Sequence, residues 1–472
     1  MIKSNIIVSS LLILPILSFG KAGINVYIEN NCSTPVTFTQ EDNSLSKQIA
    51  KDSTQKFTYI STGRWSDTTI SRTINLTDPN NQAIGNLTFT LDNGWLANYF
   101  DVNQQTGKIS SDNNKMEWHN WYGTPNITLS ACPKSLDISK SDLLKDVKRI
   151  LVFGDSLSDK GTLFEYSQGV IPSSKSYYNG MFSNSDVWAK LLKNDLKKYN
   201  IEVSNYAVGG ATAVLNPDLK HLPYSLSSEN TAFQANALDK HWKDYNQFLA
   251  IIFIGANDYL TVQNNISTET QKTLTSEVIN SIDSQVQSLI AKGVKKFVFL
   301  TLPNLSFTPE SKDDLHNTTA TANLSTMHNN KLRALVKSYQ NSSDESNSGE
   351  VFKLIDIAPL FNDLVSDDPV IRDQTNKKYN LHITNIEDSC WHGSYTLLQQ
   401  QANNPTSAIL NANPTLPRTA DILVAIKTSE SGEMCSNPEN YIFWDRVHPT
   451  KQIHQVLYQT IANTLGAKII TS

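Results

Sequence analysis

Three continuous apolar runs, at residues 150–153, 249–254 and 297–300, constrain the fold more than any other feature of this sequence. Runs that are apolar at every position are typical of parallel strands, which helices cover on both faces. Between the last two runs, apolar residues repeat at three and four positions, as on one face of a helix: Leu274, Val278, Ile282, Val286 and Leu289. Strands that alternate with helices predict an α/β domain with a parallel sheet and right-handed crossovers.

Four short segments contain residue types that catalysis uses, and each lies where an apolar run ends. They are 152–159 (VFGDSLSD), 205–211 (NYAVGGA), 254–258 (IGAND) and 445–449 (DRVHP). In open parallel sheets, ligands bind at the carboxyl ends of the strands. Ser156, Gly210 and Asn257 follow such ends closely, so we expect these three residues to lie at one edge of the sheet.

Ser156, Asp445 and His448 are the residue types of a nucleophilic triad. A serine hydroxyl becomes an effective nucleophile only when a base takes its proton. His448 is the candidate base, because Asp445, three residues earlier, can accept the Nδ1 proton and leave Nε2 for Ser156. The structural alternative is that Ser156 caps the helix after its strand, and that Asp445 and His448 lie at the start of a helix over 452–465.

In this order the four segments resemble the GDSL, or SGNH, family of serine esterases and lipases. The resemblance covers residues 148–466 and implies the SGNH-hydrolase type of α/β fold, with a parallel sheet flanked by helices. It also implies a hydrolase that needs no cofactor. The implied oxyanion donors are the backbone N–H of Ser156, the backbone N–H of Gly210 and the side chain of Asn257. Gly210 rather than Gly209 matches, because it lies five residues after Asn205.

Two further stretches narrow the resemblance to one bacterial branch of the family. Residues 177–188 (YYNGMFSNSDVW) and 302–305 (LPNL), the latter followed by Thr308 and Pro309, are similar to stretches of lipase-type members. That branch contains thermolabile haemolysins, secreted phospholipases A, lysophospholipases and glycerophospholipid:cholesterol acyltransferases. The resemblance therefore implies a phospholipid or lysophospholipid substrate at a membrane surface, with a sterol as a further acyl acceptor.

The region before the α/β pattern reads as a β-rich domain. Ile24, Val26 and Ile28 alternate with polar residues, and so do Leu87 and Phe89. Alternation with a period of two predicts half-buried antiparallel strands, and we expect a small β-sandwich. The expected organisation is a signal peptide at 1–20, a β-rich domain at 21–135, a linker at 136–148 and a catalytic domain at 149–472.

The chain contains four cysteines, which allow three pairings. An even count in an exported protein favours disulfides. We expect Cys32–Cys132 and Cys390–Cys435, because each pair brackets one coherent segment. None of the cysteines forms a Cys-X-X-Cys pair, and no histidine cluster has zinc-ligand spacing, so a metal site is not expected.

The start of the chain and its charge indicate where the protein acts. Lys3, an apolar stretch over 6–17 and small residues at 18–20 are typical of an export signal. We therefore expect a secreted protein. A formal net charge of −5 over 472 residues, with no long basic run, argues against nucleic acid as a partner.

The segment between Cys390 and Cys435 ends ten residues before Asp445. A long insertion beside a catalytic pair is more often a functional lid than a passive loop. We expect it to cover the acyl pocket, and cleavage by an activating protease to raise activity on lipid. Two rival functions stay open. One is a carbohydrate O-acetyl esterase, and the other is a membrane-binding toxin or adhesin with a relic catalytic domain.

Overall fold

The computed structural model describes most of the chain. The described residues are 23–41, 45–51, 53–60, 68–93, 97–118, 125–167, 169, 171–174, 176–214, 224–260, 266–312, 318–346, 349–393 and 432–471. The chain forms two compact units, Met1–Pro133 and Lys134–Ser472, and each has its own hydrophobic core. The predicted signal at 1–20 lies outside the described residues.

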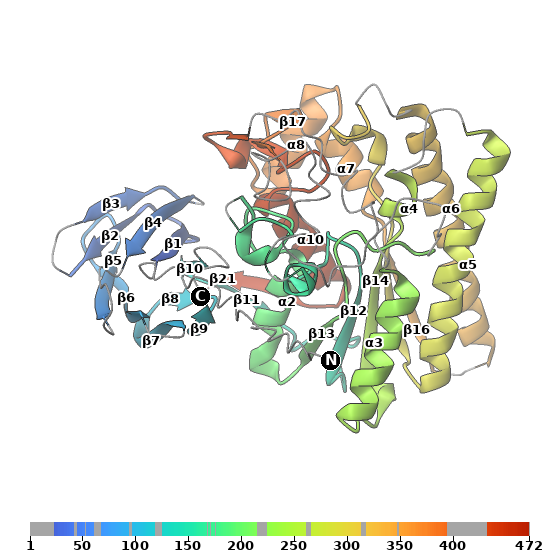
Figure 1. The fold of residues 1–472 in the computed structure, drawn as a ribbon, viewed down its shortest axis with the longest axis horizontal. Coiled ribbons are helices and arrows are strands. Elements are labelled where there is room, and N and C mark those ends of the chain that lie inside the picture. Colours follow the sequence, from blue (N-terminus) through green and yellow to red (C-terminus); the bar gives the residue numbers. More distant parts are fainter. Residues whose placement is uncertain are drawn as a thin grey trace, which may run out of the picture. The chain divides into compact units, whose positions relative to one another are not determined.

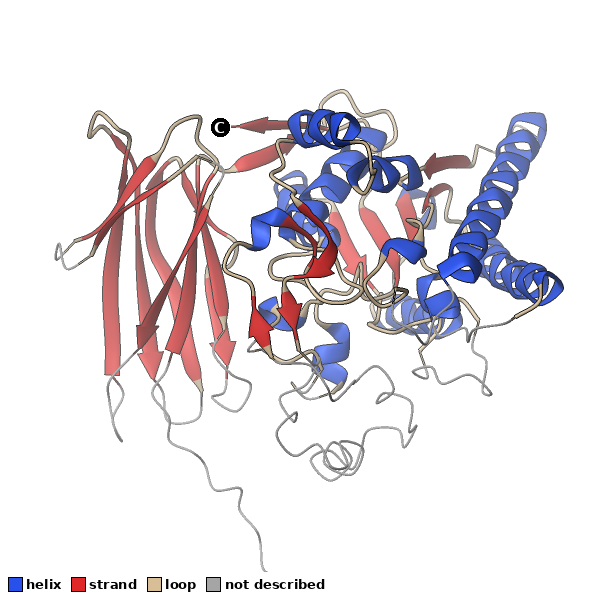
Figure 2. Ribbon diagram, turned by 90° about the horizontal axis from the view of Figure 1, so that it is seen from above, coloured by secondary structure: helices blue, strands red, loops and turns tan. Residues whose placement is uncertain are grey.

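The first unit contains strands and no helix in its described part (Figure 2). Its strands are β1 (Gly23–Asn30), β2 (Val36–Gln40), β3 (Ser46–Ile49), β4 (Thr54–Ile60), β5 (Thr68–Thr77), β6 (Ala83–Asn93), β7 (Asn98–Gly107), β8 (Ile109–Ser111), β9 (Lys115–Trp118) and β10 (Asn126–Ala131). They form two sheets, of order β4-β1-β10-β8 and β3-β2-β5-β6-β7-β9. One core cluster draws buried residues from both sheets, as in a sandwich.

One strand pair of this sandwich differs from the sequence prediction. β1 and β10 pair in parallel, with Ile28 beside Leu129, whereas alternation alone suggested antiparallel strands throughout. A period of two reports only which face of a strand is buried, so it cannot give the direction of the neighbour. Cys32 and Cys132 follow the ends of this pair and are joined by a disulfide, with their Cα atoms 5.0 Å apart.

The second unit is built on a five-stranded parallel sheet of order β13-β12-β14-β15-β16. Its strands are β12 (Arg149–Gly154), β13 (Glu202–Asn205), β14 (Phe248–Phe253), β15 (Lys296–Leu300) and β16 (Val351–Ile355). The three predicted runs form β12, β14 and β15, in the centre of the sheet. The edge strands β13 and β16 were not predicted, because polar residues interrupt their apolar positions.

Helices flank this sheet, as the alternating pattern predicts. They are α1 (Thr162–Tyr166), α2 (Trp188–Leu196), α3 (Leu226–Asp239), α4 (Ala256–Leu260), α5 (Thr268–Lys292), α6 (Thr318–Ser346), α7 (Ala358–Leu364), α8 (Pro369–Tyr379) and α10 (Lys451–Thr464). Figure 1 shows α3, α5 and α6 running alongside the strands. The helix predicted between β14 and β15 is α5, which ends at Gly293 in a left-handed conformation.

Short elements complete the second unit. They are the strands β11 (Lys134–Asp137), β17 (Asn385–Ser389), β18 (Trp391–His392), β19 (Glu433–Met434), β20 (Tyr441–Phe443) and β21 (Lys468–Thr471), and the 3-10 turns η2 (Tyr178–Gly180), η3 (Lys197–Tyr199), η4 (Tyr245–Gln247), η5 (Leu305–Phe307) and η8 (Pro438–Asn440). No described helix is long and apolar enough to span a membrane.

The segment expected to be a linker, 136–148, is packed into the second unit. β11 pairs with the C-terminal strand β21, so the expected linker begins inside a strand. Leu144 and Val147 are buried, and the Ser141 hydroxyl donates to the carbonyl oxygen of Leu465. The stretch was predicted to be a linker because most of its residues are polar. Its buried apolar residues pack it into the second unit.

The separate cores predict that damage to the sandwich leaves the second unit intact. Phe89 is fully buried and packs against Tyr59 and Phe100, so Phe89→Ala should destabilise the first unit by about 3–5 kcal/mol. Denaturant unfolding measures this change, and turnover of a soluble short-chain ester should stay unchanged. Tyr99→Ala, at an exposed ring on β7, is the control and should cost about 0.5 kcal/mol or less. Equal losses for both variants would contradict the assignment of the core.

Candidate active site

Ser156 lies in a tight turn directly after the central strand β12. The turn is held by the Asp155 carboxylate, which accepts the backbone N–H of Leu157, and by the Asp155 carbonyl, which accepts that of Ser158, both at 3.0 Å. Gly154 permits the close approach of β14, since a Cβ there would lie 2.4 Å from the carbonyl oxygen of Phe253. The turn therefore places the Ser156 hydroxyl at the edge of the parallel sheet where the strands have their carboxyl ends.

Ser156, His448 and Asp445 form a continuous chain of hydrogen bonds. The Ser156 hydroxyl lies 2.7 Å from His448 Nε2, and His448 Nδ1 lies 2.8 Å from Asp445 Oδ2. Only 6%, 5% and 2% of the surfaces of Ser156, His448 and Asp445 are exposed. Because the Asp445 carboxylate can only accept, the proton of a neutral His448 lies on Nδ1, and Nε2 is the acceptor toward the serine.

Asp445 is held as an ionised, fixed carboxylate. Burial alone would raise its pKa, but the charge of His448 and hydrogen bonds from His448 and Val447 lower the pKa below its usual range. The backbone N–H groups of Val447 and His448 both donate to Asp445 Oδ1 at 2.8 Å. Both side chains are buried, and α10 begins at Lys451 with Thr450 as its N-cap, so neither residue is a surface cap of that helix.

The second segment is hydrogen-bonded to the turn that holds Ser156, and the third segment is hydrogen-bonded to the second. Asn205 donates from its side chain to the carbonyl of Ser158 at 2.6 Å, and Asn257 donates to the carbonyl of Ala211 at 2.9 Å. The backbone N–H of Gly209 donates to Asp159 at 2.7 Å. That N–H is therefore engaged, whereas Gly210 follows it in a left-handed conformation with φ of 77°.

Several buried carboxyl groups support these turns, and no role for them was predicted from the sequence. Asp159 accepts from Gly209 and from the backbone N–H groups at the start of α1, which are those of Gly161, Thr162 and Leu163. Asp258 accepts from Ala213 and Val214, and burial raises its pKa to about 7. Burial likewise raises the pKa of Asp155 to about 6.

Glu229, in the first turn of α3, contacts the end of strand β12. Its Oε2 accepts the backbone N–H of Gly154 at 2.9 Å, and burial raises its pKa well above its ordinary value. Asp159 and Asp258 could have been found from their places in the first and third segments. Glu229 lies outside all four segments, so no motif pointed to it.

An apolar pocket opens beside Ser156. Asn257 and Asn304 contribute polar groups to it, and most of its wall is hydrocarbon. The apolar lining residues are Leu157, Phe253, Ala256, Leu260, Pro303, Leu305, Phe307, Phe361, Val365, Phe443, Val447, Pro449 and Leu457. Residues 303–305 of the stretch 302–305, which is similar to a stretch of lipase-type members, thus line the space next to Ser156.

The insertion expected to form a lid can be described only at its base. Cys390 and Cys435 are joined by a disulfide, with their Cα atoms 4.8 Å apart, and β18 pairs with β19 beside it. Residues 394–431, which would form the lid, lie outside the described residues. Within the described part of the chain, no group of three or more His, Cys, Asp or Glu side chains could hold a metal ion.

Curated proteins similar to this chain include three bacterial proteins. The phosphatidylcholine-sterol acyltransferase of Aeromonas hydrophila is 28% identical over 71% of this chain and 95% of its own length. The secreted effector protein SseJ of Salmonella typhimurium is 26% identical over 68% of this chain and 64% of its own length. The thermolabile hemolysin of Vibrio parahaemolyticus is 27% identical over 35% of this chain and 36% of its own length.

A family model agrees with the geometry of the site. The model of GDSL-like lipases and acylhydrolases matches residues 150–461, which include the four segments 152–159, 205–211, 254–258 and 445–449. This match covers about two thirds of the chain. The chain therefore belongs to the GDSL lipase/acylhydrolase family.

Proposed function

We propose that this protein is an exported serine acyl hydrolase that cleaves fatty acyl esters of phospholipids or lysophospholipids through an acyl-enzyme. The observation that carries the choice of substrate is the apolar pocket beside Ser156. An alkyl chain gains about 0.8 kcal/mol for each methylene that it buries, and the wall of this pocket is mostly hydrocarbon. The lipid substrates named for the Aeromonas relative point in the same direction.

The proposed reaction uses Ser156 as nucleophile and His448 as general base. His448 Nε2 takes the hydroxyl proton as Ser156 Oγ attacks the ester carbonyl, and then gives it to the departing alcohol of the lipid. Asp445 stabilises the imidazolium that forms between these two steps. Water, activated by His448 in the same way, then releases the fatty acid and restores the free serine.

Negative charge on the former carbonyl oxygen needs hydrogen-bond donors. We assign this role to the backbone N–H groups of Ser156 and Gly210 and to the Asn257 side chain. The Asn257 side chain donates to the carbonyl of Ala211 and lines the pocket beside Ser156, which places it next to the reacting ester. The engagement of the Gly209 N–H with Asp159 supports Gly210 as the donor of the second segment.

The acyl acceptor and the site of action are part of the same proposal. A sterol hydroxyl could replace water in the second step, as the name of the Aeromonas relative indicates for that protein. Export is supported by the pattern of residues 1–20 and by two disulfides, which persist in oxidising compartments. Activation by proteolysis between Cys390 and Cys435 stays a proposal from the sequence alone.

Defined substrates test this function. The purified protein is incubated with phosphatidylcholine and lysophosphatidylcholine vesicles, with and without cholesterol, and with acetyl and palmitoyl esters of one alcohol. We expect release of fatty acid from the lipids, formation of cholesteryl ester if sterols are acceptors, and faster turnover of the palmitoyl ester. Faster release of acetate, above all from acetylated sugars, would favour the carbohydrate esterase instead. An absence of turnover on every ester would favour a membrane-binding toxin or adhesin whose catalytic domain is inactive.

Loss of the nucleophile or the base should remove nearly all activity. Ser156→Ala and His448→Asn should each lower kcat by roughly 10⁴-fold or more, and the double variant should lose little beyond the single ones, because the residues act as a unit. Ester turnover measures the loss, and the thermal midpoint checks that folding is retained. Multiplicative losses in the double variant would show that the two side chains act independently.

Asn257→Ala tests the oxyanion assignment. Removing one donor should lower kcat by roughly 10²- to 10³-fold while KM changes little, because the charge exists only in the transition state. Asn236→Ala, at an exposed asparagine of α3, is the control and should behave as the unchanged protein. Near-normal kcat in a folded Asn257→Ala protein would remove Asn257 from the oxyanion site.

Two substitutions in the pocket should change chain-length preference in opposite directions. Val365→Phe narrows the pocket, so the ratio of kcat/KM for palmitoyl esters to kcat/KM for butyryl esters should fall by about 10-fold or more. Phe361→Ala widens the pocket and should raise the same ratio. Ile371→Ala, on the exposed surface of α8, is the control. Ratios that stay constant in all three variants would mean that the acyl chain binds elsewhere.

A further inference from the structure

The segment between β12 and α2 places two aromatic side chains against the hydrogen-bonded chain of the site. The Tyr177 hydroxyl donates to Asp445 Oδ2 at 2.8 Å. The Phe182 ring lies over the imidazole of His448, with 4.8 Å between the ring centroids and 35° between the planes. Both aromatic rings are buried. Each of the two residues thus contacts a different member of the acid–base pair.

Tyr177 completes the set of donors around the Asp445 carboxylate. Oδ2 accepts from Tyr177 and from His448 Nδ1, and Oδ1 accepts from the backbone N–H groups of Val447 and His448. With at least two donors on each oxygen, rotation of the carboxylate would break several bonds at once. A buried carboxylate that lost the Tyr177 hydroxyl would keep only His448 Nδ1 as a donor to Oδ2 and would gain freedom to turn.

Phe182 fills the space between His448 and the second segment. A Cβ at Gly209 would lie 2.4 Å from the Phe182 ring, so the ring is in close contact with the turn that precedes Gly210. One face of the imidazole is therefore covered by the same side chain that supports the proposed oxyanion turn. A flat ring at this place restricts the imidazole to a narrow range of tilts.

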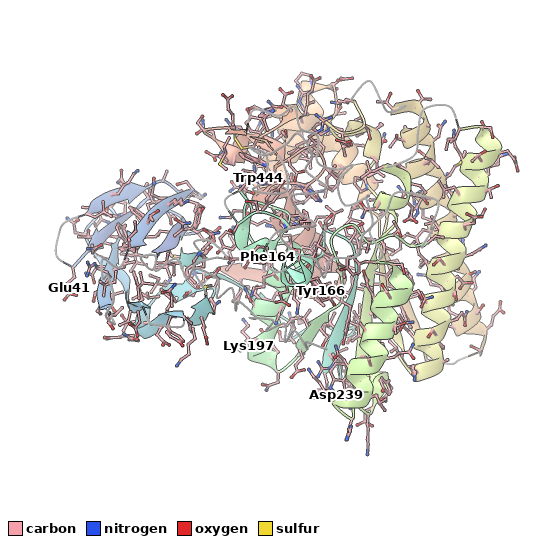
Figure 3. The ribbon with its side chains drawn as sticks, in the orientation of Figure 1. Glu41, Phe164, Tyr166, Lys197, Asp239 and Trp444 are labelled. Atoms are coloured by element: carbon pink, nitrogen blue, oxygen red, sulfur yellow. A yellow bond between two sulfur atoms is a disulfide. The ribbon has the colours of Figure 1, made fainter. Side chains whose placement is uncertain are left out.

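The segment that carries these two rings is itself fixed. Gly180 has φ of 74°, and a Cβ there would lie 2.5 Å from Phe164, a side chain labelled in Figure 3. The Ser183 hydroxyl donates to the carbonyl of Pro449 at 3.0 Å. The segment is thereby attached to the same turn that holds His448, so the two rings and the histidine belong to one packed unit.

We propose that Tyr177 and Phe182 are positioning residues of the acyl transfer, with Tyr177 orienting the Asp445 carboxylate and Phe182 the His448 imidazole. This inference rests on the proposed roles of Ser156, His448 and Asp445. The competing explanation is a purely structural one, because Tyr177 also packs with Cys390 and Trp444 in a small buried cluster. The two explanations differ in whether the effect of Tyr177 depends on Asp445.

Tyr177→Phe removes the hydroxyl and keeps the ring, so it isolates the hydrogen bond. We expect kcat on a soluble nitrophenyl ester to fall roughly 10- to 100-fold, with KM within about twofold of the unchanged protein. Tyr178→Phe makes the same chemical change at the next residue, which is also buried, and should leave kcat within about twofold. Equal kcat for Tyr177→Phe and the unchanged protein would overturn the assignment.

A double-mutant cycle separates positioning from folding. In an Asp445→Ala background, Tyr177→Phe should cause no further loss of kcat, because the carboxylate that it orients is gone. A second loss of the same size in that background would show that Tyr177 acts through the fold alone. Thermal midpoints of all four proteins show whether each is folded at the assay temperature.

Phe182→Leu supplies an independent arm, since it keeps an apolar side chain but loses the flat face. We expect kcat to fall roughly 10-fold with little change in KM, and an unchanged kcat would remove Phe182 from the proposal. Failure of the underlying function looks different. It would appear as turnover by the unchanged protein that survives Ser156→Ala, whereas failure of this inference leaves Ser156 essential and the Tyr177 and Phe182 variants active.

Discussion

The hydrogen bond between Ser156 Oγ and His448 Nε2 joins residues that lie 292 positions apart in the chain. The central strand β12 delivers the serine, and the turn between β20 and α10 delivers the histidine. The parallel sheet, its crossover helices and the packed C-terminal helix must all form before the two atoms meet. A local motif cannot create this contact, so an active site of this kind depends on the complete second unit.

Buried carboxyl groups hold the turns around the site in place by accepting hydrogen bonds from the backbone. Asp159, Asp258 and Glu229 each accept backbone N–H groups from the turns that surround Ser156. Within the described residues, none of the three forms an ion pair with lysine or arginine. Burial raises the pKa of each, because the charged form loses its hydration. These hydrogen bonds fix the turns before substrate binds. Donors that are already in place stabilise the negative charge that develops on an oxyanion.

The sequence predicted the parts of the structure that rest on strong periodicity or on short motifs. The apolar runs gave the central strands, and the spacing of Asp445 and His448 fits their hydrogen bond. That spacing alone is weak evidence for a catalytic pair, because Asp313 and His316 have the same spacing. Those two residues lie outside the described part of the chain. Contacts between segments that lie far apart in the chain leave no local pattern in the sequence. The parallel pairing of β1 with β10, the place of Glu229 under β12 and the bond from Tyr177 to Asp445 required the folded chain.

Labelling of the serine tests the central claim, a fatty acyl transfer at Ser156, most directly. The protein is treated with a fluorophosphonate that carries a long alkyl chain, and is then digested and mapped by mass spectrometry. The proposed mechanism predicts one adduct per chain, on the peptide with Ser156, formed at the rate at which turnover is lost and slowed by phospholipid vesicles. Full turnover after complete modification of Ser156, or loss of turnover with the adduct at a different serine, would contradict it.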